Sequence, residues 1–222
     1  RIKKMIYLDY AANYPCKKEV LEALNEVELN YIGNYNSSHE AGVKSKEKFN
    51  ELDSSITNIL NLDNEHEVIY VSSATEANNL ALKGICSSYS GFGKKILVSE
   101  LEHSSVNGAL GYLKDNGFIV DFIKTNNDGS IMLSSLQEKL TSDVILVCVC
   151  LVDGETGYIH DYHKISEIVK NSNAHCSSLI CFFNAAKLSS DKTCSILQAS
   201  CSDIFLSTPR LTSHSVNTRC FS

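Results

Sequence analysis

The sequence predicts an α/β fold in which helices cover both faces of a mainly parallel sheet. Beyond residue 94, short apolar segments alternate with segments of helical spacing, which is the pattern of successive βαβ units. The segment Val144–Val149 is apolar throughout, as expected of a strand that is buried on both faces. Apolar residues form 43% of the 222-residue chain, enough for a substantial core. We therefore expect a three-layer αβα arrangement.

The first part of the chain is expected to be mainly helical. Ile6–Leu8 is a short extended piece, and Pro15 stands where the first turn of a helix would begin. A polar loop, GNYNSSHEAG at 33–42, separates this helix from a second helix at Val43–Leu60. The first helix is indicated by apolar residues at helical spacing, namely Val20, Leu21, Leu24 and Val27.

An apolar run at Val68–Val71 predicts a strand that leads into a helix opened by small hydroxyl residues. The first N–H groups of a helix have no partner within the helix and lie at the positive end of its dipole. Ser72, Ser73 and Thr75 add hydroxyl donors there, and Ala74 lets the backbone approach an anion closely. This turn therefore suits a phosphate group. The alternative is an ordinary N-capped helix that binds no ligand.

The remaining elements follow in regular alternation, with a turn predicted at Asn126–Gly129. The expected strands are Lys95–Val98, Phe118–Ile123, Val144–Val149, Leu179–Phe183 and Asp203–Leu206, and the expected helices are His103–Asn116, Leu133–Leu140 and Asp161–Asn171. Ligands of such folds bind beyond the carboxyl ends of the strands. Polar segments at those ends are Ser72–Thr75, Ser99–His103, Asp153–Glu155, Asn184–Lys187 and Ser207–Arg210.

Charge and cysteine usage exclude several classes of function. The net charge is −6, without a basic block, which argues against binding to nucleic acid. No apolar run reaches membrane-spanning length, so we expect no membrane insertion. The nine cysteines include no CxxC pair, which favours reduced thiols over a disulfide framework and predicts no metal site. Cys148 and Cys150 share one face of a predicted strand, and we interpret them as structural.

Several motifs together resemble those of the cysteine desulfurases, which are pyridoxal-phosphate enzymes of fold type I in the class V aminotransferase group. YLDYAAN at Tyr7–Asn13 is similar to the family's YLDYxAT start, and the loop at 33–42 is similar to GNPSSxHxxG. SATEANNLALKG at Ser73–Gly84 matches GATESxNLAxKG, and SELEHSSV at Ser99–Val106 matches the family's TEH loop. The resemblance runs from Ile6 to Arg210 and implies a desulfurase-like large domain at 1–210 with a divergent tail at 211–222.

The resemblance assigns roles to several residues of the predicted site. It implies that Ser73, Ala74 and Thr75 hold the cofactor phosphate, through backbone amides and the Thr hydroxyl. It also implies that His103 stacks on the pyridine ring and exchanges protons, which an imidazole can do near neutral pH. Taken alone, without the neighbouring motif matches, His103 is better interpreted as a surface histidine at the start of a helix.

The sequence departs from the family where catalysis needs it most. The lysine that forms the Schiff base is replaced in the alignment by Arg210, whose guanidinium stays protonated and cannot form an imine. The carboxylate that pairs with the pyridinium nitrogen is replaced by Asn184, which carries no charge. The family's glutamine that contacts the ring's phenolic oxygen is Lys187, which is either a substitute Schiff-base lysine or a plain surface amine. An asparagine of the family's NNE loop is lost in Asp153–Glu155.

These departures favour one function over another. The chain ends at Ser222, so we expect the family's small domain to be absent, and Cys220 has no context that would identify it as the nucleophile. We expect a catalytically inactive protein with no cofactor or a vestigial pyridoxal-phosphate site, serving as a structural or regulatory subunit. Expected partners are an active paralogue or a large organellar complex. The alternative is an active desulfurase that supplies persulfide sulfur for iron-sulfur clusters or tRNA thiolation. The basic start Arg1–Lys4 and the resemblance suggest a mitochondrial location.

Overall fold

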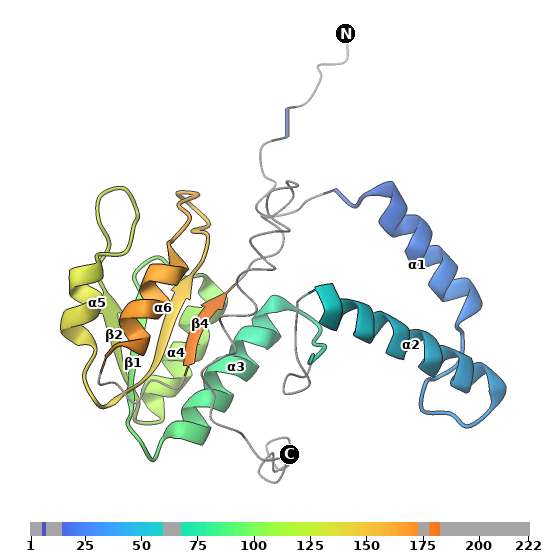
Figure 1. Cartoon of the computed structure of the whole chain (residues 1–222), viewed down its shortest axis with the longest axis horizontal. Coiled ribbons are helices and arrows are strands. Elements are labelled where there is room, and N and C mark those ends of the chain that lie inside the picture. The colour runs from blue at the N-terminus through green and yellow to red at the C-terminus, as the bar shows by residue number, and fades with distance from the viewer. Residues whose placement is uncertain (1–5, 8–14, 60–67, 173–177, 183–222) are drawn as a thin grey trace. The chain divides into compact units, whose positions relative to one another are not determined.

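The computed structural model describes residues 6–7, 15–59, 68–172 and 178–182 (Figure 1). The chain divides into two compact units, and the division along the described chain falls between Ile69 and Tyr70. The strand predicted at Asp203–Leu206 lies outside the described residues, and so does Cys220. Each unit is described below by itself.

The described residues of the first unit form helices α1 at Lys18–Asn30 and α2 at Glu40–Ile59. Helix α1 begins after Lys17, whose backbone is extended, so the expectation that Pro15 opens the first turn was wrong. Pro15 lies before the helix, two residues ahead of its N-cap. No residue of α1 is buried among the described residues. Gly42 lies in the first turn of α2, where an added Cβ would collide with the backbone carbonyl oxygen of Ser37, so the close approach of the preceding loop requires a glycine there.

In the described part of the second unit, the strands form a four-stranded sheet whose order is β2-β1-β3-β4. All neighbouring strands are parallel, as the alternating pattern predicted. The strands are β1 at Lys95–Ser99, β2 at Ile119–Ile123, β3 at Val144–Cys150 and β4 at Ser178–Phe182. The central strand β3 is buried along nearly its whole length, which accounts for its uninterrupted apolar sequence.

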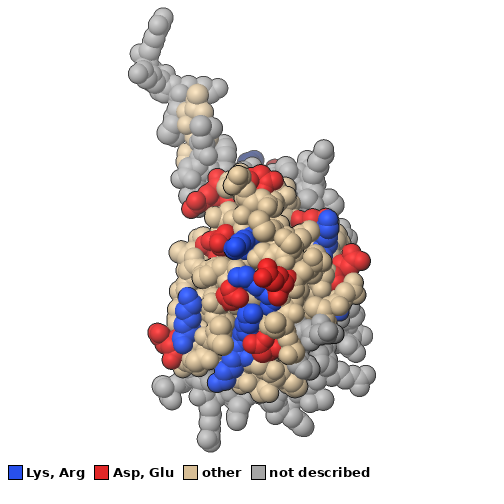
Figure 2. Space-filling model, turned by 90° about the vertical axis from the view of Figure 1, so that its left-hand side faces the viewer, with Lys and Arg blue, Asp and Glu red and all other residues tan. Residues whose placement is uncertain are grey.

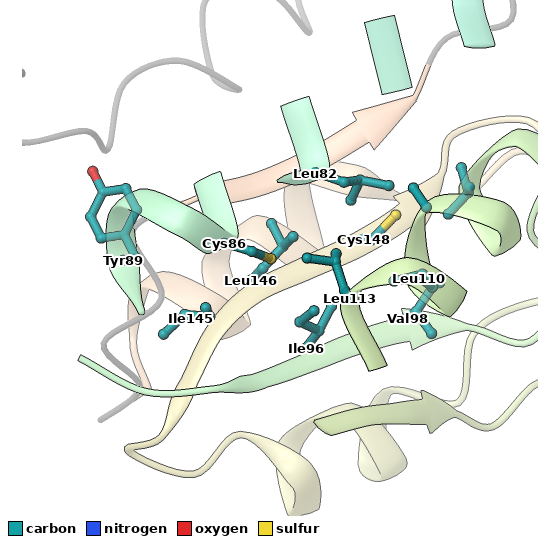
Figure 3. Packing of buried hydrophobic residues seen from close by; sticks show 12 residues of the cluster. Leu82, Cys86, Tyr89, Ile96, Val98, Leu110, Leu113, Ile145, Leu146 and Cys148 are labelled. Atoms are coloured by element: carbon teal, nitrogen blue, oxygen red, sulfur yellow. The ribbon is translucent and has the colours of Figure 1, made fainter. Parts of the chain in front are cut away.

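Helices cover both faces of this sheet. They are α3 at Ala74–Tyr89, α4 at Ser104–Asp115, α5 at Leu133–Lys139 and α6 at Tyr162–Lys170 (Figure 1). Helices α3 and α4 pack on one face, where Leu82, Leu110 and Leu146 belong to one apolar cluster (Figure 3). Leu97 and Val147 point to the opposite face and are fully buried there, on the side of α5 and α6. The predicted three-layer αβα fold is confirmed.

The segment Val68–Val71 is not a strand, so that expectation was wrong. No described strand pairs with it, and Ile69 and Tyr70 are exposed. An apolar run becomes a strand only where a neighbour completes its backbone hydrogen bonds. The turn predicted at Asn126–Gly129 is confirmed, because Gly129 has a positive φ angle of 85°. Gly117, which follows α4, also has a positive φ angle, of 84°.

The described cysteines differ in exposure. Cys86 and Cys148 are fully buried among leucines and valines of the core (Figure 3). Burial raises the pKa of the Cys86 thiol to about 12, so this thiol stays protonated and unreactive. Cys16 is exposed, and all of these cysteines are free thiols. Cys148 is buried, as its position in an apolar segment indicated, whereas Cys150 on the same strand is partly exposed.

The described surface shows mixed charge. Figure 2 shows acidic side chains interspersed with lysines on one face of the molecule, without a large patch of one sign. The lysines in the middle of this face have acidic side chains beside them. Among the helices of the described ranges, none combines the length and apolar character needed to span a bilayer.

Candidate cofactor site

At the N-terminus of α3, the side chains of Ser73 and Glu76 accept hydrogen bonds from neighbouring groups of the same segment. Ser73 is the N-cap, and its Oγ accepts a hydrogen bond from Glu76 N at 3.2 Å. The Glu76 carboxylate accepts hydrogen bonds from Ser72 N at 2.8 Å and Ser72 Oγ at 2.6 Å. These two bonds lower the pKa of Glu76. The local sequence therefore caps its own helix, much as in a capping box.

The next two residues leave donors open. No described residue accepts a hydrogen bond from the backbone N–H of Ala74 or Thr75. Nor does any described residue form a hydrogen bond with the Thr75 hydroxyl. Both residues are exposed at the positive end of the helix dipole. Of the three residues predicted to hold a phosphate, Ala74 and Thr75 therefore offer free donors. The Ser73 Oγ accepts the cap hydrogen bond from Glu76 N and keeps its own O–H to donate.

His103 is the N-cap of α4, the position that Ser73 has on α3. Its Nδ1 accepts a hydrogen bond from Ser105 N at 3.2 Å and lies 2.8 Å from Ser105 Oγ. Ser105 Oγ in turn accepts a hydrogen bond from Asn78 Nδ2 on α3, at 2.7 Å. The two helix starts that the sequence assigned to one site are therefore joined by a direct side-chain connection, and the His103 side chain is exposed.

Glu102 is a residue of this region that sequence reasoning missed. Its Oε1 accepts hydrogen bonds from Ser99 Oγ at 2.7 Å and Cys150 N at 2.6 Å, which ties the ends of β1 and β3 together. Its Oε2 is buried without a hydrogen-bond partner among the described residues. Burial raises the pKa of Glu102 to about 7, although the hydrogen bonds from Ser99 and Cys150 oppose this. The sequence feature that could have identified Glu102 is its place directly before His103, just after the end of a predicted strand.

The loop after β3 uses its carboxylate internally. Asp153 is 3% exposed, and its Oδ1 accepts hydrogen bonds from Thr156 N and Thr156 Oγ1 at 2.6 Å each, and from Glu155 N at 3.1 Å. Burial acts to raise the pKa of Asp153, but the hydrogen bonds from Thr156 and Glu155 outweigh it and lower the pKa. Asp153 therefore shapes the loop. All of these contacts lie within the loop, so they do not perform the role of the family's asparagine, which contacts the cofactor.

Three of the predicted positions are not placed by the structure. Asn184, Lys187 and Arg210 lie outside the described residues, so their departures from the family pattern remain observations on the sequence. Within the described part of the chain there is no group of three or more His, Cys, Asp or Glu side chains arranged to hold a metal ion.

The described residues fit the phosphate end of pyridoxal phosphate. Ala74 N–H, Thr75 N–H and the Thr75 hydroxyl form an open set of donors, to which the α3 dipole adds a favourable field. His103 presents a flat, exposed ring at the neighbouring helix start. When bound in a pyridoxal-phosphate enzyme, the cofactor acts as an electron sink for the attached amino acid.

Comparison with known proteins identifies the family of the chain. The family model described as aminotransferase class-V matches residues 6–178. Cysteine desulfurase IscS of Buchnera aphidicola is 38% identical over 177 residues, which cover 77% of this chain and 43% of the relative. Cysteine desulfurase IscS 1 of Archaeoglobus fulgidus is 36% identical over 170 residues, with 77% and 44% covered. The chain thus spans less than half the length of these relatives.

Solved structures give the same fold. DndA from Streptomyces lividans superposes with a TM-score of 0.69 at 27% identity, covering 87% of this chain and 52% of that one. A NifS-like protein superposes with a TM-score of 0.70 at 24% identity, covering 76% of this chain and 47% of that one. The chain therefore belongs to the class V aminotransferase family, with a fold like that of the cysteine desulfurases.

Proposed function

We propose that this protein is a cysteine desulfurase-like chain that binds a phosphate-bearing group at α3 but performs no desulfuration, and that it serves as a structural or regulatory subunit. The observation that supports phosphate binding is the set of free donors at Ala74 and Thr75. The bound group would be pyridoxal phosphate or a simpler phosphate. Its aromatic part, where present, would face the His103 ring.

The proposed lack of activity is supported by the sequence beyond the described residues. Arg210 stands where the family places its Schiff-base lysine, and a guanidinium cannot form that bond. Asn184 stands where the family places a carboxylate, so nothing there would keep a pyridine nitrogen protonated. Either change alone would remove most of the cofactor's catalytic use, and the two occur together.

A subunit role follows from retention of the fold without the chemistry. The proposed partners are an active paralogue or a large organellar complex, and the proposed compartment is the mitochondrion. Isolation of the tagged full-length protein from its native source tests the role, with a defined complex of constant stoichiometry as the expected result. A stable free monomer would contradict it. Fractionation of the same cells tests the compartment.

Cofactor chemistry is tested separately with purified protein. Incubation with pyridoxal phosphate should give reversible binding, no covalent pyridoxyl adduct after borohydride reduction, and no alanine from added cysteine. Peptide mapping by mass spectrometry locates any adduct. A borohydride-trapped pyridoxyl group on Lys187 would overturn the proposed inactivity.

The competing function is an active desulfurase that supplies persulfide sulfur for iron-sulfur clusters or tRNA thiolation. It is favoured by the retained donors of Thr75 and by His103, which an inactive chain has no catalytic need to keep. Production of alanine in step with pyridoxal-phosphate loading would establish it, and the Lys187→Arg variant would show whether that lysine carries the chemistry.

A further inference from the structure

Asn78 and Ser105 form a polar contact between α3 and α4 that the cofactor site does not require. Asn78 is 8% exposed and Ser105 is 9% exposed, so both side chains are largely shielded from water. Asn78 Nδ2 donates to Ser105 Oγ at 2.7 Å, and Ser105 Oγ lies 2.8 Å from His103 Nδ1. Buried polar side chains cost free energy unless their partners are well placed.

The direction of these hydrogen bonds follows from the chemistry of the groups. The Asn78 amide nitrogen can only donate, so Ser105 Oγ accepts from it and keeps its own proton for His103. The backbone N–H of Ser105 also can only donate, and it points at the same Nδ1 at 3.2 Å. Both groups that contact Nδ1 are therefore donors. A neutral imidazole that accepts at Nδ1 carries its proton on Nε2.

We propose that Asn78 and Ser105 are positioning residues that hold His103 as the Nε2–H tautomer. Asn78, which lies on α3, orients the imidazole ring through Ser105. The backbone N–H of Ser105 fixes Nδ1 as an acceptor, and the Asn78–Ser105 pair ties the ring to the helix that carries the phosphate donors. Movement of α3 relative to α4 would therefore turn His103.

The tautomer decides what His103 can offer a ligand. With Nδ1 occupied by Ser105, Nε2 is the nitrogen left to meet a bound molecule, and it does so as a hydrogen-bond donor. The matching ligand atom must be an acceptor, such as a phenolate or carboxylate oxygen. This last consequence rests on the proposed cofactor site. The tautomer itself is measured in the ligand-free protein, so the two ideas fail separately.

The test uses full-length protein labelled with ¹⁵N-histidine, at a pH roughly two units above the usual histidine pKa of about 6.5. Two-bond ¹⁵N–¹H correlation spectra report which ring nitrogen carries the proton, and a His103→Gln variant identifies the signals of His103. We expect the Nε2–H tautomer to dominate in the natural protein. Dominance of the Nδ1–H tautomer would overturn the proposal.

Asn78→Asp tests the polarity of the connection. An aspartate accepts the Ser105 proton, which leaves Ser105 Oγ able only to accept from Nδ1. We expect the ratio of Nε2–H to Nδ1–H to fall about fivefold, the equivalent of one neutral hydrogen bond. Asn79→Asp is the matched control. Asn79 Nδ2 donates a hydrogen bond to Thr75 O and not to Ser105, so this substitution should leave the tautomer ratio unchanged. An equal effect of both substitutions, or an effect of neither, would refute the role of Asn78.

Ser105→Ala adds no charge and provides a second measurement in case Asn78→Asp folds poorly. The His103 ring then loses its side-chain link to α3, so we expect increased ring motion in ¹³C relaxation of its Cε1–H. Ser105→Thr retains the hydroxyl and should restore the natural value. Unchanged ring motion in Ser105→Ala would refute the proposal.

Discussion

Replacement of Glu102 by Gln should remove a pH dependence from the stability of the second unit. The Glu102 carboxyl group has an unpartnered, buried Oε2 at the junction of β1 and β3, and burial raises its pKa from 4.5 to about 7. Gln is isosteric and can keep the acceptor contacts to Ser99 and Cys150, but it does not titrate. The variant therefore isolates the cost of ionising this one group.

The sign and size of the effect follow from linkage between protonation and folding. Below pH 4.5 the Glu102 carboxyl group is protonated in both the folded and the unfolded chain. Between 4.5 and about 7 the folded chain holds a proton that the unfolded chain has released, so the free energy of unfolding falls as pH rises. Each pKa unit corresponds to about 1.4 kcal/mol, and the loss reaches about 3 kcal/mol above neutral pH.

Urea unfolding from about pH 4 to about pH 8, followed by circular dichroism, measures the difference between the natural protein and Glu102→Gln. The free energy of the natural protein relative to the variant should decline by about 3 kcal/mol across this range. Glu100→Gln gives the baseline for the same change at an exposed carboxylate of this loop, whose Oε2 accepts hydrogen bonds from Thr125 N and Thr125 Oγ1 at 3.0 Å each, contacts that Gln can keep. A difference between natural protein and Glu102→Gln that stays constant with pH would refute the reasoning.

The remaining predictions concern the phosphate donors, the helix cap and the core. Thr75→Val should weaken binding of pyridoxal phosphate about fivefold by removing one hydroxyl donor, and Thr75→Ser should restore it, as measured by isothermal titration calorimetry. Ser73→Ala removes the N-cap of α3 and should lower the free energy of unfolding by about 1 kcal/mol in urea titrations. Leu82→Ala should cost about 2–5 kcal/mol because Leu82 is fully buried, whereas Leu80→Ala, at a position 45% exposed, should cost less than about 1 kcal/mol. Equal costs for the two leucines would contradict the assigned core.

Most of the fold was predictable because its signals are local. Alternation of apolar and helical segments gave the strands β1 to β4 to within about two residues, which is the usual uncertainty of element ends. The same reasoning failed at Val68–Val71, where the apolar run suits a strand but no described strand pairs with it. Strand formation depends on a neighbouring strand, and the tertiary structure decides whether a neighbour is present.

The candidate site was predictable in its location but not in its connections. The motif at Ser73–Thr75 and the position of His103 followed from sequence, since a helix start exposes donors whatever surrounds it. Three other features required coordinates: the use of Ser73 as a cap, the capture of Asp153 by its own loop, and the buried oxygen of Glu102.

The sequence by itself determined the fold class, the family pattern and the residue types that depart from it, among them Arg210 and Asn184. These depend on residue identity and spacing, which the chain carries without folding. Tertiary structure alone decided that Asn78 reaches Ser105 and, through Ser105, His103. Asn78 and Ser105 stand 27 residues apart in the chain, so only the packing of α3 on α4 brings them together.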